Sequence, residues 1–219
     1  MNQPQKLMAV GLLALVGWRV YVALKVDGPS GSLPADGWLS GADSILSSAA
    51  QSIDSFTGGF MKISAMAGVD PGLVNHPNVR AMLAVIRTGE GTTSASGYQT
   101  LFGGGKFTSL SDHPRIVVKR SGFASTAAGA YQFLASSWDE TKRIMGLPDF
   151  SPASQDVAAV GRLAARGALA DVVRGDFRAA IAKINKEWAS LPGSPYGQPV
   201  MTMATAQQVF VANGGQVVA

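Results

Sequence analysis

The chain has 219 residues, of which 47% are hydrophobic, and it carries a formal net charge of +4. This length and apolar content suffice for one sizeable core with an appended segment, and they exclude disorder throughout the chain. The chain has no cysteine, so disulfides, cysteine nucleophiles and thiolate metal sites are excluded. His76 and His113 each precede a proline in unrelated segments and offer no paired-ligand spacing, so we predict neither a metal nor a cofactor.

The N-terminal segment is predicted to be a membrane anchor spanning residues 1–25. Residues 7–24 read LMAVGLLALVGWRVYVAL, with one interior charge at Arg19, close to Trp18 and Tyr21 at one end. As a helix this run would extend about 27 Å, close to the roughly 30 Å hydrocarbon core of a bilayer. A cleaved signal peptide is the main alternative, but no small-residue cleavage site follows promptly. A buried soluble helix is the third interpretation.

Residues 26–76 are predicted to form a linker that contains a short amphipathic helix. The stretch GPSGSLPADGW is rich in Gly, Pro and Ser, which is typical of a flexible tether. The helix that follows carries an apolar stripe, made of Ala42, Ile45, Leu46, Ala49, Ile53 and Phe56. Its partner could be the same chain, a bilayer surface, or another virion protein contacting residues 39–66.

Residues 77–200 are predicted to form the main domain, followed by a C-terminal helix or tail at 201–219. Apolar residues at three- and four-residue steps predict a core-facing helix from Asn78; they are Val79, Met82, Leu83 and Ile86. The β-prone runs 98–102 and 106–110 flank three glycines, which predicts a hairpin. Helical patterns then dominate from about 125 to 185, with a long one near 154–170 and another near 176–188. The predicted fold class is therefore α+β.

Glu90 is the candidate catalytic residue, because it lies where the helical pattern stops and a glycine-rich stretch begins. A carboxyl group at such a junction is predicted to face a cleft, where apolar walls raise its pKa and suit it to donate a proton. The alternative is a solvated glutamate at a helix end.

The segment from about 75 to 198 resembles the phage lambda endolysin family. Several separated motifs carry the resemblance, namely EGT at 90–92, GY at 97–98, FT at 107–108, SDHPR at 111–115, YQ at 131–132, DFSP at 149–152, SQD at 154–156, RGAL at 166–169, WASLPG at 188–193 and YGQ at 196–198. Their order and spacing make the match specific, although each alone would be weak. The resemblance implies a lysozyme-like fold, mainly helical with a small antiparallel sheet or hairpin.

It also implies a lytic transglycosylase that cuts the glycan strands of peptidoglycan. In this family a single glutamate protonates the glycosidic oxygen and then helps the C6 hydroxyl of N-acetylmuramic acid attack its own anomeric carbon, which gives a 1,6-anhydro product. By motif match, Glu90 takes that role. A hydrolytic lysozyme would need two carboxylates. A wall-binding or structural virion protein without turnover is the non-enzyme alternative.

The remaining acids are interpreted as structural. Asp112 precedes His-Pro and is assigned a turn or cap role rather than that of a nucleophile. Asp139, Asp149 and Asp156 are assigned to caps or helix surfaces, and Glu140 and Glu187 to solvated helix positions.

The candidate substrate-binding residues are Tyr98, Tyr131, Gln132, Tyr196 and Gln198. Tyr131 and Gln132 lie in GAYQ, which is similar to the GLMQ motif of other lytic transglycosylases and places them near the sugar subsites. Core packing is the alternative for each tyrosine. Ala130 departs from the family pattern, in which a bulkier basic residue stands.

The basic residues concentrate from Arg80 onward, which suits attraction to a polyanion such as the bacterial wall. Without a long Lys/Arg run or a recognisable nucleic-acid-binding motif, no nucleic acid partner is predicted. An anchor with a cytoplasmic N-terminus would place the catalytic domain on the periplasmic side of the host inner membrane. The enzyme could then be an exported endolysin that is released for lysis, or a virion-associated enzyme that opens the wall at infection.

Overall fold

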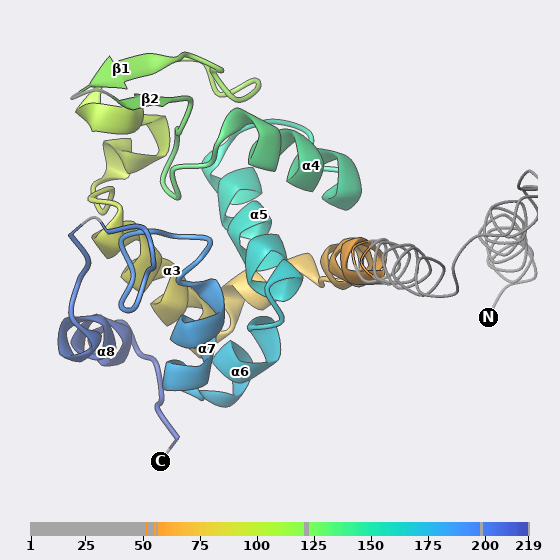
Figure 1. Cartoon of the computed structure of the whole chain (residues 1–219), viewed down its shortest axis with the longest axis vertical. Coiled ribbons are helices and arrows are strands. Elements are labelled where there is room, and N and C mark those ends of the chain that lie inside the picture. The colour runs from red at the N-terminus through yellow and green to blue at the C-terminus, as the bar shows by residue number, and fades with distance from the viewer. Residues whose placement is uncertain (1–50, 52–54, 56, 121–122, 198, 219) are drawn as a thin grey trace, which may run out of the picture. The chain divides into compact units, whose positions relative to one another are not determined.

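The computed structural model describes residues 51, 55, 57–120, 123–197 and 199–218, and residues 53–219 group as one compact unit. Its helices are α3 (Pro77–Gly89), α4 (Ala135–Met145), α5 (Pro152–Ala165), α6 (Leu169–Arg174), α7 (Phe177–Ile184) and α8 (Met203–Ala212). Short 3-10 turns cover Pro71–Asn75, Ala95–Gln99 and Phe102–Gly104. In Figure 1 the β1–β2 hairpin lies at the opposite end of this unit from α6 and α7. The mainly helical fold with a small antiparallel hairpin confirms the predicted α+β class.

Helix α3 is the central element of the unit. It begins at Pro77, whose missing N–H costs nothing in a first turn, and the His76 side chain accepts a hydrogen bond from the backbone N–H of Asn78. The predicted apolar stripe is confirmed, since its four members are at most 6% exposed, namely Val79, Met82, Leu83 and Ile86. This face packs against α5, α6 and α8, so the C-terminal end of α3 is held by the core.

The hairpin lies elsewhere in the chain than predicted. Strands β1 (Val118–Arg120) and β2 (Phe123–Ser125) pair antiparallel, with Lys119 opposite Ala124. In the predicted location the chain curls into 3-10 turns, because Gly103 and Gly104 adopt positive φ angles, and a single bridge joins Thr100 to Lys106. Leu101 instead bridges to Ala128. The prediction of extended strands at 98–102 and 106–110 is therefore wrong.

The long helical pattern predicted near 154–170 is interrupted. Helix α5 begins earlier, at Pro152, where the Ser151 hydroxyl caps it by accepting from the N–H of Ser154. It ends at Ala165, with Arg166 as C-cap, because Gly167 takes a left-handed conformation with φ +67°, and α6 starts two residues after this glycine. The pattern near 176–188 gives the shorter helix α7, which Asp176 caps through the N–H of Ala179.

A cluster of aromatic side chains fills the core between α4 and the loop before α5. Trp138 is fully buried and meets Phe150 edge-on, with ring centroids 4.6 Å apart. Phe133 lies 5.7 Å from Trp138 and 5.9 Å from Tyr131. Such aromatic contacts add to the stabilisation from burial, so this cluster fixes the loop that carries Tyr131 and Gln132.

Residues 57–67, which the sequence assigned to the linker, are helical and contact the rest of the unit. Lys62 forms an ion pair of 2.8 Å with Glu140 of α4, and Met66 is 1% exposed. Among the helices that the structure describes, none is long and apolar enough to cross a bilayer. The predicted anchor at 7–24 and all six residues of the predicted apolar stripe at 42–56 lie outside the described residues.

Candidate functional site

Glu90 lies at the C-terminal end of α3, as the sequence predicted. It is the last residue with helical backbone angles, φ −79° and ψ −4°, and its N–H still donates to the carbonyl of Ile86. The next residue, Gly91, adopts φ +68° and turns the chain away from the helix axis. The side chain of Glu90 is partly buried, so the carboxyl group is held at a helix end rather than on a solvated helix face.

The hydrogen-bond partner of Glu90 comes from a distant part of the chain. The Ser190 hydroxyl donates to Oε1 of Glu90 over 2.7 Å. The neighbouring Gly89 makes this approach possible, because a Cβ there would lie 2.5 Å from Ser190 Oγ and 3.2 Å from Ser190 Cβ. Ser190 belongs to the WASLPG motif, yet the sequence alone assigned it no role, and only the position of Gly89 next to Glu90 hinted that something packs there.

Burial raises the pKa of the Glu90 carboxyl, and the hydrogen bond from Ser190 partly offsets the rise by stabilising the ionised form. The two causes of the shift are burial and a neutral hydroxyl, and no second carboxylate contributes to it. A carboxyl group whose pKa is raised in this way holds its proton closer to neutral pH, which suits a proton donor.

The turn after Glu90 is fixed by two side chains. The Arg87 guanidinium donates to the carbonyls of Thr92, Thr93 and Ser94 over 3.0 to 3.3 Å. The buried Thr92 hydroxyl donates to the carbonyl of Ala130 over 2.5 Å. The EGT turn is therefore tied to the GAYQ loop, which the family resemblance places near the sugar subsites.

Tyr98 and Tyr131 converge on one carboxylate. Both hydroxyls donate to Oδ1 of Asp156, over 2.9 and 2.6 Å. Tyr131 is 2% exposed, and its carbonyl accepts from the Trp188 indole. Burial and the charge of Asp156 raise the pKa of Tyr98 to about 12. This geometry matches the core-packing alternative for Tyr131. It also corrects the surface or cap role predicted for Asp156.

The other candidate sugar contacts are not gathered into one cluster. Gln132 adopts φ +47°, and its amide donates to the carbonyls of Thr100 and Gly129. Tyr196 is 60% exposed and donates to the carbonyl of Lys186. Gln198 lies outside the described residues. Gln132 lies in the GAYQ loop, in which the Ala130 carbonyl accepts a hydrogen bond from the Thr92 hydroxyl of the EGT turn.

Asp112 has a structural role, as predicted. It accepts hydrogen bonds from the Trp138 indole and from Lys142, both over 3.0 Å, and pairs with Arg115. Partial burial alone would raise its pKa, but these donors outweigh it and lower the pKa to about 2. A group this acidic holds no proton to donate at neutral pH.

The prediction that Glu140 and Glu187 are solvated is wrong. Both bind Arg162, whose side chain is 5% exposed, and Glu187 is itself 10% exposed and also pairs with Arg166. They form a structural ion-pair network. Asp149 accepts from the N–H of Ser151 and the hydroxyl of Ser154 at the start of α5, which confirms its cap role.

His113 lies in an irregular segment between the 3-10 turn Phe102–Gly104 and β1, yet its side chain is part of the core. It is 4% exposed, accepts at Nδ1 from the N–H of Arg115, and so carries its proton on Nε2, which donates to the carbonyl of Phe133. Across the residues that the structure describes, no three His, Cys, Asp or Glu side chains are grouped closely enough to hold a metal ion.

Comparison with known proteins identifies the family. The sequence profile described as Endolysin matches residues 80–217. The endolysin of Escherichia phage P2 is 38% identical over 161 residues, which are 66% of this chain and 98% of that protein. The chain belongs to the endolysin family.

The endolysin of Escherichia phage lambda is 44% identical over 126 residues, covering 54% of this chain and 80% of the relative. Solved structures agree. Bacteriophage lambda lysozyme in complex with a chitohexasaccharide is 40% identical with a TM-score of 0.62, and it matches 65% of this chain and 97% of its own. A second structure of lysozyme from bacteriophage lambda gives a TM-score of 0.58 at 39% identity. The chain is thus an endolysin similar to lambda lysozyme, an enzyme that degrades peptidoglycan.

Proposed function

We propose that this endolysin is a lytic transglycosylase in which Glu90 acts first as the general acid and then as the general base. The observation that carries the proposal is the partly buried Glu90 carboxyl, bound by one neutral hydroxyl from Ser190 and set at the end of α3. The substrate is the β-1,4 bond between N-acetylmuramic acid and N-acetylglucosamine. The chitohexasaccharide in the lambda lysozyme complex supports glycan binding by this fold.

In the first step the protonated Glu90 donates its proton to the glycosidic oxygen. The bond between this oxygen and the anomeric carbon of muramic acid breaks, the N-acetylglucosamine leaves as an alcohol, and positive charge develops on the sugar ring. The proton leaves from Oε2, since Oε1 accepts the Ser190 hydroxyl. The resulting carboxylate stabilises the charged ring, and the same hydroxyl stabilises the carboxylate.

In the second step the C6 hydroxyl of the same muramic acid attacks the anomeric carbon. Its proton passes to Glu90, which regains its starting form, and the new C–O bond closes the 1,6-anhydro ring. No water is consumed. One carboxylate suffices because the nucleophile is part of the substrate, whereas a hydrolase positions a second carboxylate to activate water or to attack. Asp112, the nearest sequence candidate for such a group, is engaged by Trp138, Lys142 and Arg115.

Mass spectrometry of muropeptides released from purified wall tests this proposal. We expect 1,6-anhydro ends from the parent enzyme and about a 10³-fold lower rate from Glu90→Gln, a typical loss for a removed general acid. Reducing ends would instead indicate hydrolysis and overturn the transglycosylase assignment. Undiminished activity in Glu90→Gln would overturn the role of Glu90. Asp112→Asn is the matched control, and its products should remain anhydro.

We further propose that residues 1–25 anchor the enzyme in the host inner membrane, with the segment from residue 26 up to the packed helix at 57–67 as linker and the catalytic unit in the periplasm. The support is the apolar run 7–24 and its flanking lysines. The relatives are endolysins, which favours release for host lysis over a role in the virion. Fractionation of cells that make the full chain tests this. The protein should pellet with membranes, deletion of 1–25 should move it to the soluble fraction, and its detection in purified virions would favour the other setting.

A further inference from the structure

A polar hollow of about 330 Å³ lies along α3 and plays no part in the proposed proton transfers. It is lined by charged and hydrogen-bonding side chains that include Arg80, Arg87, Tyr98, Tyr131, Asp156 and Asn213, over a floor from Leu83 and Ala84 of α3. Polar and charged side chains that converge on a hollow can fix the orientation of a ligand.

Two opposite charges line this hollow without pairing with each other. The exposed guanidinium of Arg80 makes no hydrogen bond or ion pair with any residue that the structure describes. Oδ1 of Asp156 accepts hydrogen bonds from both tyrosine hydroxyls. Its Oδ2 accepts no hydrogen bond from the described part of the chain. Arg87 cannot satisfy it, because its guanidinium is occupied by the carbonyls of 92–94 and by the Tyr98 hydroxyl.

The charge pattern selects the kind of ligand. A simple anion would be attracted by Arg80 but repelled by Asp156. A simple cation would be attracted by Asp156 but repelled by Arg80. A group that carries an ammonium and a carboxylate a few bonds apart satisfies both, with the carboxylate on Arg80 and the ammonium on Asp156 Oδ2. The hollow therefore fits an amino-acid end group.

The peptidoglycan strand itself carries such groups. Its muramic acids bear short stem peptides, which end in free carboxylates and, where they are not cross-linked, in a free amino group. Ten residues of helix separate Arg80 from Glu90, which is about 15 Å at roughly 1.5 Å per residue. A four-residue stem peptide spans up to about 14 Å when extended, about 1 Å less than this rise. The hollow extends along α3 from Arg80 to Arg87, and the long Arg80 side chain covers the remainder, so the end of the peptide can meet Arg80 from a sugar at Glu90.

We propose that the hollow between Arg80 and Asp156 binds the amino-carboxylate end of a stem peptide on the strand being cut. This inference rests on the proposed function of Glu90 and adds a peptide-recognition site to it. The enzyme then distinguishes peptide-bearing wall from bare glycan, although the bond that it breaks lies between sugars.

The first test compares kcat/KM on peptide-bearing glycan strands with kcat/KM on the same strands after an amidase has removed the peptides. We expect Arg80→Gln to lower the ratio of kcat/KM on peptide-bearing strands to kcat/KM on stripped strands about tenfold. This is the effect expected from the loss of one charge-assisted hydrogen bond. Arg80→Lys, which keeps the charge, should restore most of the ratio. An unchanged ratio in Arg80→Gln would overturn the proposal.

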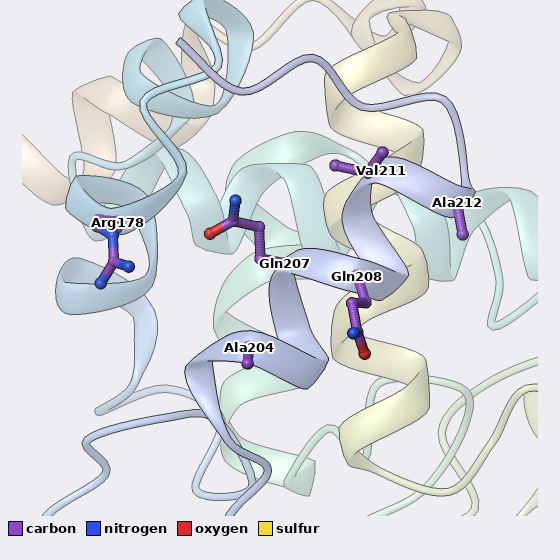
Figure 2. A pocket seen from close by; sticks show the side chains of 6 residues that line it. All are labelled: Arg178, Ala204, Gln207, Gln208, Val211 and Ala212. Atoms are coloured by element: carbon purple, nitrogen blue, oxygen red, sulfur yellow. The ribbon is translucent and has the colours of Figure 1, made fainter. Parts of the chain in front are cut away.

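Arg178→Gln is the matched control. Arg178 of α7 is also an exposed arginine whose side chain has no partner among the described residues, and it lines a separate hollow together with Gln207 and Gln208 of α8 (Figure 2). Its substitution removes the same charge from the same protein, so the ratio should remain that of the parent. An equal loss in Arg178→Gln would show that net charge alone governs the preference, which also contradicts a specific site.

The second test is independent of turnover. Stem tetrapeptide, acylated at its first residue as it is on the strand, is titrated into the Glu90→Gln variant, and backbone amide shifts are followed by NMR. We expect perturbations around Arg80 and Asp156, and an about tenfold weaker affinity when the free amino group of the peptide is acetylated, since acetylation removes the charge that Asp156 binds. An affinity that is unchanged by acetylation, or amide shifts that lie away from Arg80 and Asp156, would overturn the proposal. If the parent cuts neither kind of strand, the proposed function fails, and this titration still decides the peptide site.

Discussion

The Ser190 hydroxyl lies 2.7 Å from Oε1 of Glu90, although 100 positions separate the two residues in the chain. This contact joins the end of α3 to the WASLPG segment, and it couples the acidity of the candidate catalytic group to the fold of a distant loop. The hydrogen bond lowers a pKa that burial has raised, so Ser190 is a positioning residue that also tunes the acid.

Replacing Ser190 with Ala should shift the pH dependence of kcat/KM. Without the donated hydrogen bond, burial acts on Glu90 unopposed and its pKa rises further, so the alkaline limb, where the acid loses its proton, moves to higher pH. We expect about a tenfold lower maximal rate from the less well-oriented carboxyl. The measurement is a pH–rate profile on purified wall.

Ser194→Ala is the control for this shift. Ser194 Oγ is buried and has no hydrogen-bond partner among the described residues, so its removal should leave the profile in place. If Ser190→Ala showed the same alkaline limb as the parent, the hydrogen bond would have no influence on the reacting group.

Gly89→Ala should disrupt the same contact from the other side. Alanine is normally favoured over glycine in a helix by about 1 kcal/mol, but here its Cβ would lie 2.5 Å from Ser190 Oγ. We expect a loss of about 1–3 kcal/mol in the free energy of unfolding, as for other overpacked sites, together with a rate loss like that of Ser190→Ala. Denaturant unfolding and wall-degradation assays measure the two effects.

The double variant Gly89→Ala/Ser190→Ala provides the check. Because both changes act on one contact, their effects on rate should be smaller together than the sum of the single losses. Additive losses would mean that Gly89 acts on something other than Ser190.

Glu187→Gln should be strongly destabilising. Arg162 is 5% exposed, and Glu187, 10% exposed, meets it over 2.6 Å. Neutralising the carboxylate leaves a buried guanidinium without its main partner, which typically costs about 3–5 kcal/mol. Glu140→Gln is the comparison, because Glu140 also binds Arg162 but is 34% exposed. Equal losses in the two variants, measured by thermal or urea unfolding, would contradict the burial argument.

Asp112 should contribute to the stability of the enzyme at neutral but not at very low pH. Its folded pKa of about 2 lies below the ordinary value of about 3.9. Its stabilisation is therefore fully present above about pH 4 and is lost as the pH falls through about 2. Urea unfolding of Asp112→Asn should show a deficit at neutral pH that shrinks as the solution is acidified. Since the Asp112 side chain is 40% exposed, the deficit should be modest, and one that stays constant with pH would contradict the linkage.

Local patterns in the sequence predicted the parts of this site that depend on neighbours in the chain. The apolar stripe of α3 identified its buried face, and the glycines at 89 and 91 identified where the helix ends and where Glu90 therefore lies. These features follow from helical periodicity and from the backbone freedom of glycine. The order of the motifs along the chain was by itself specific enough to indicate the endolysin family.

Features set by distant contacts were missed. Nothing in the sequence around Ser190 indicates its hydrogen bond to Glu90. The local pattern places Asp156 on a helix surface, and only the tertiary structure brings the hydroxyls of Tyr98 and Tyr131 to it. The hairpin was misplaced because β-prone residues around Gly103 to Gly105 resemble strands, whereas the pairing of Leu101 with Ala128 draws that chain elsewhere. Strand propensity is weak where tertiary partners decide the pairing.

The attachment of helix 57–67 through Lys62 and Met66 has a consequence for proteolysis. Both contacts lie within one turn of each other, and both involve only residues after position 56. A protease that cuts the chain upstream of 57 would therefore release a fragment that keeps both of these contacts, and the helix would remain attached to α4 through the ion pair of Lys62 with Glu140.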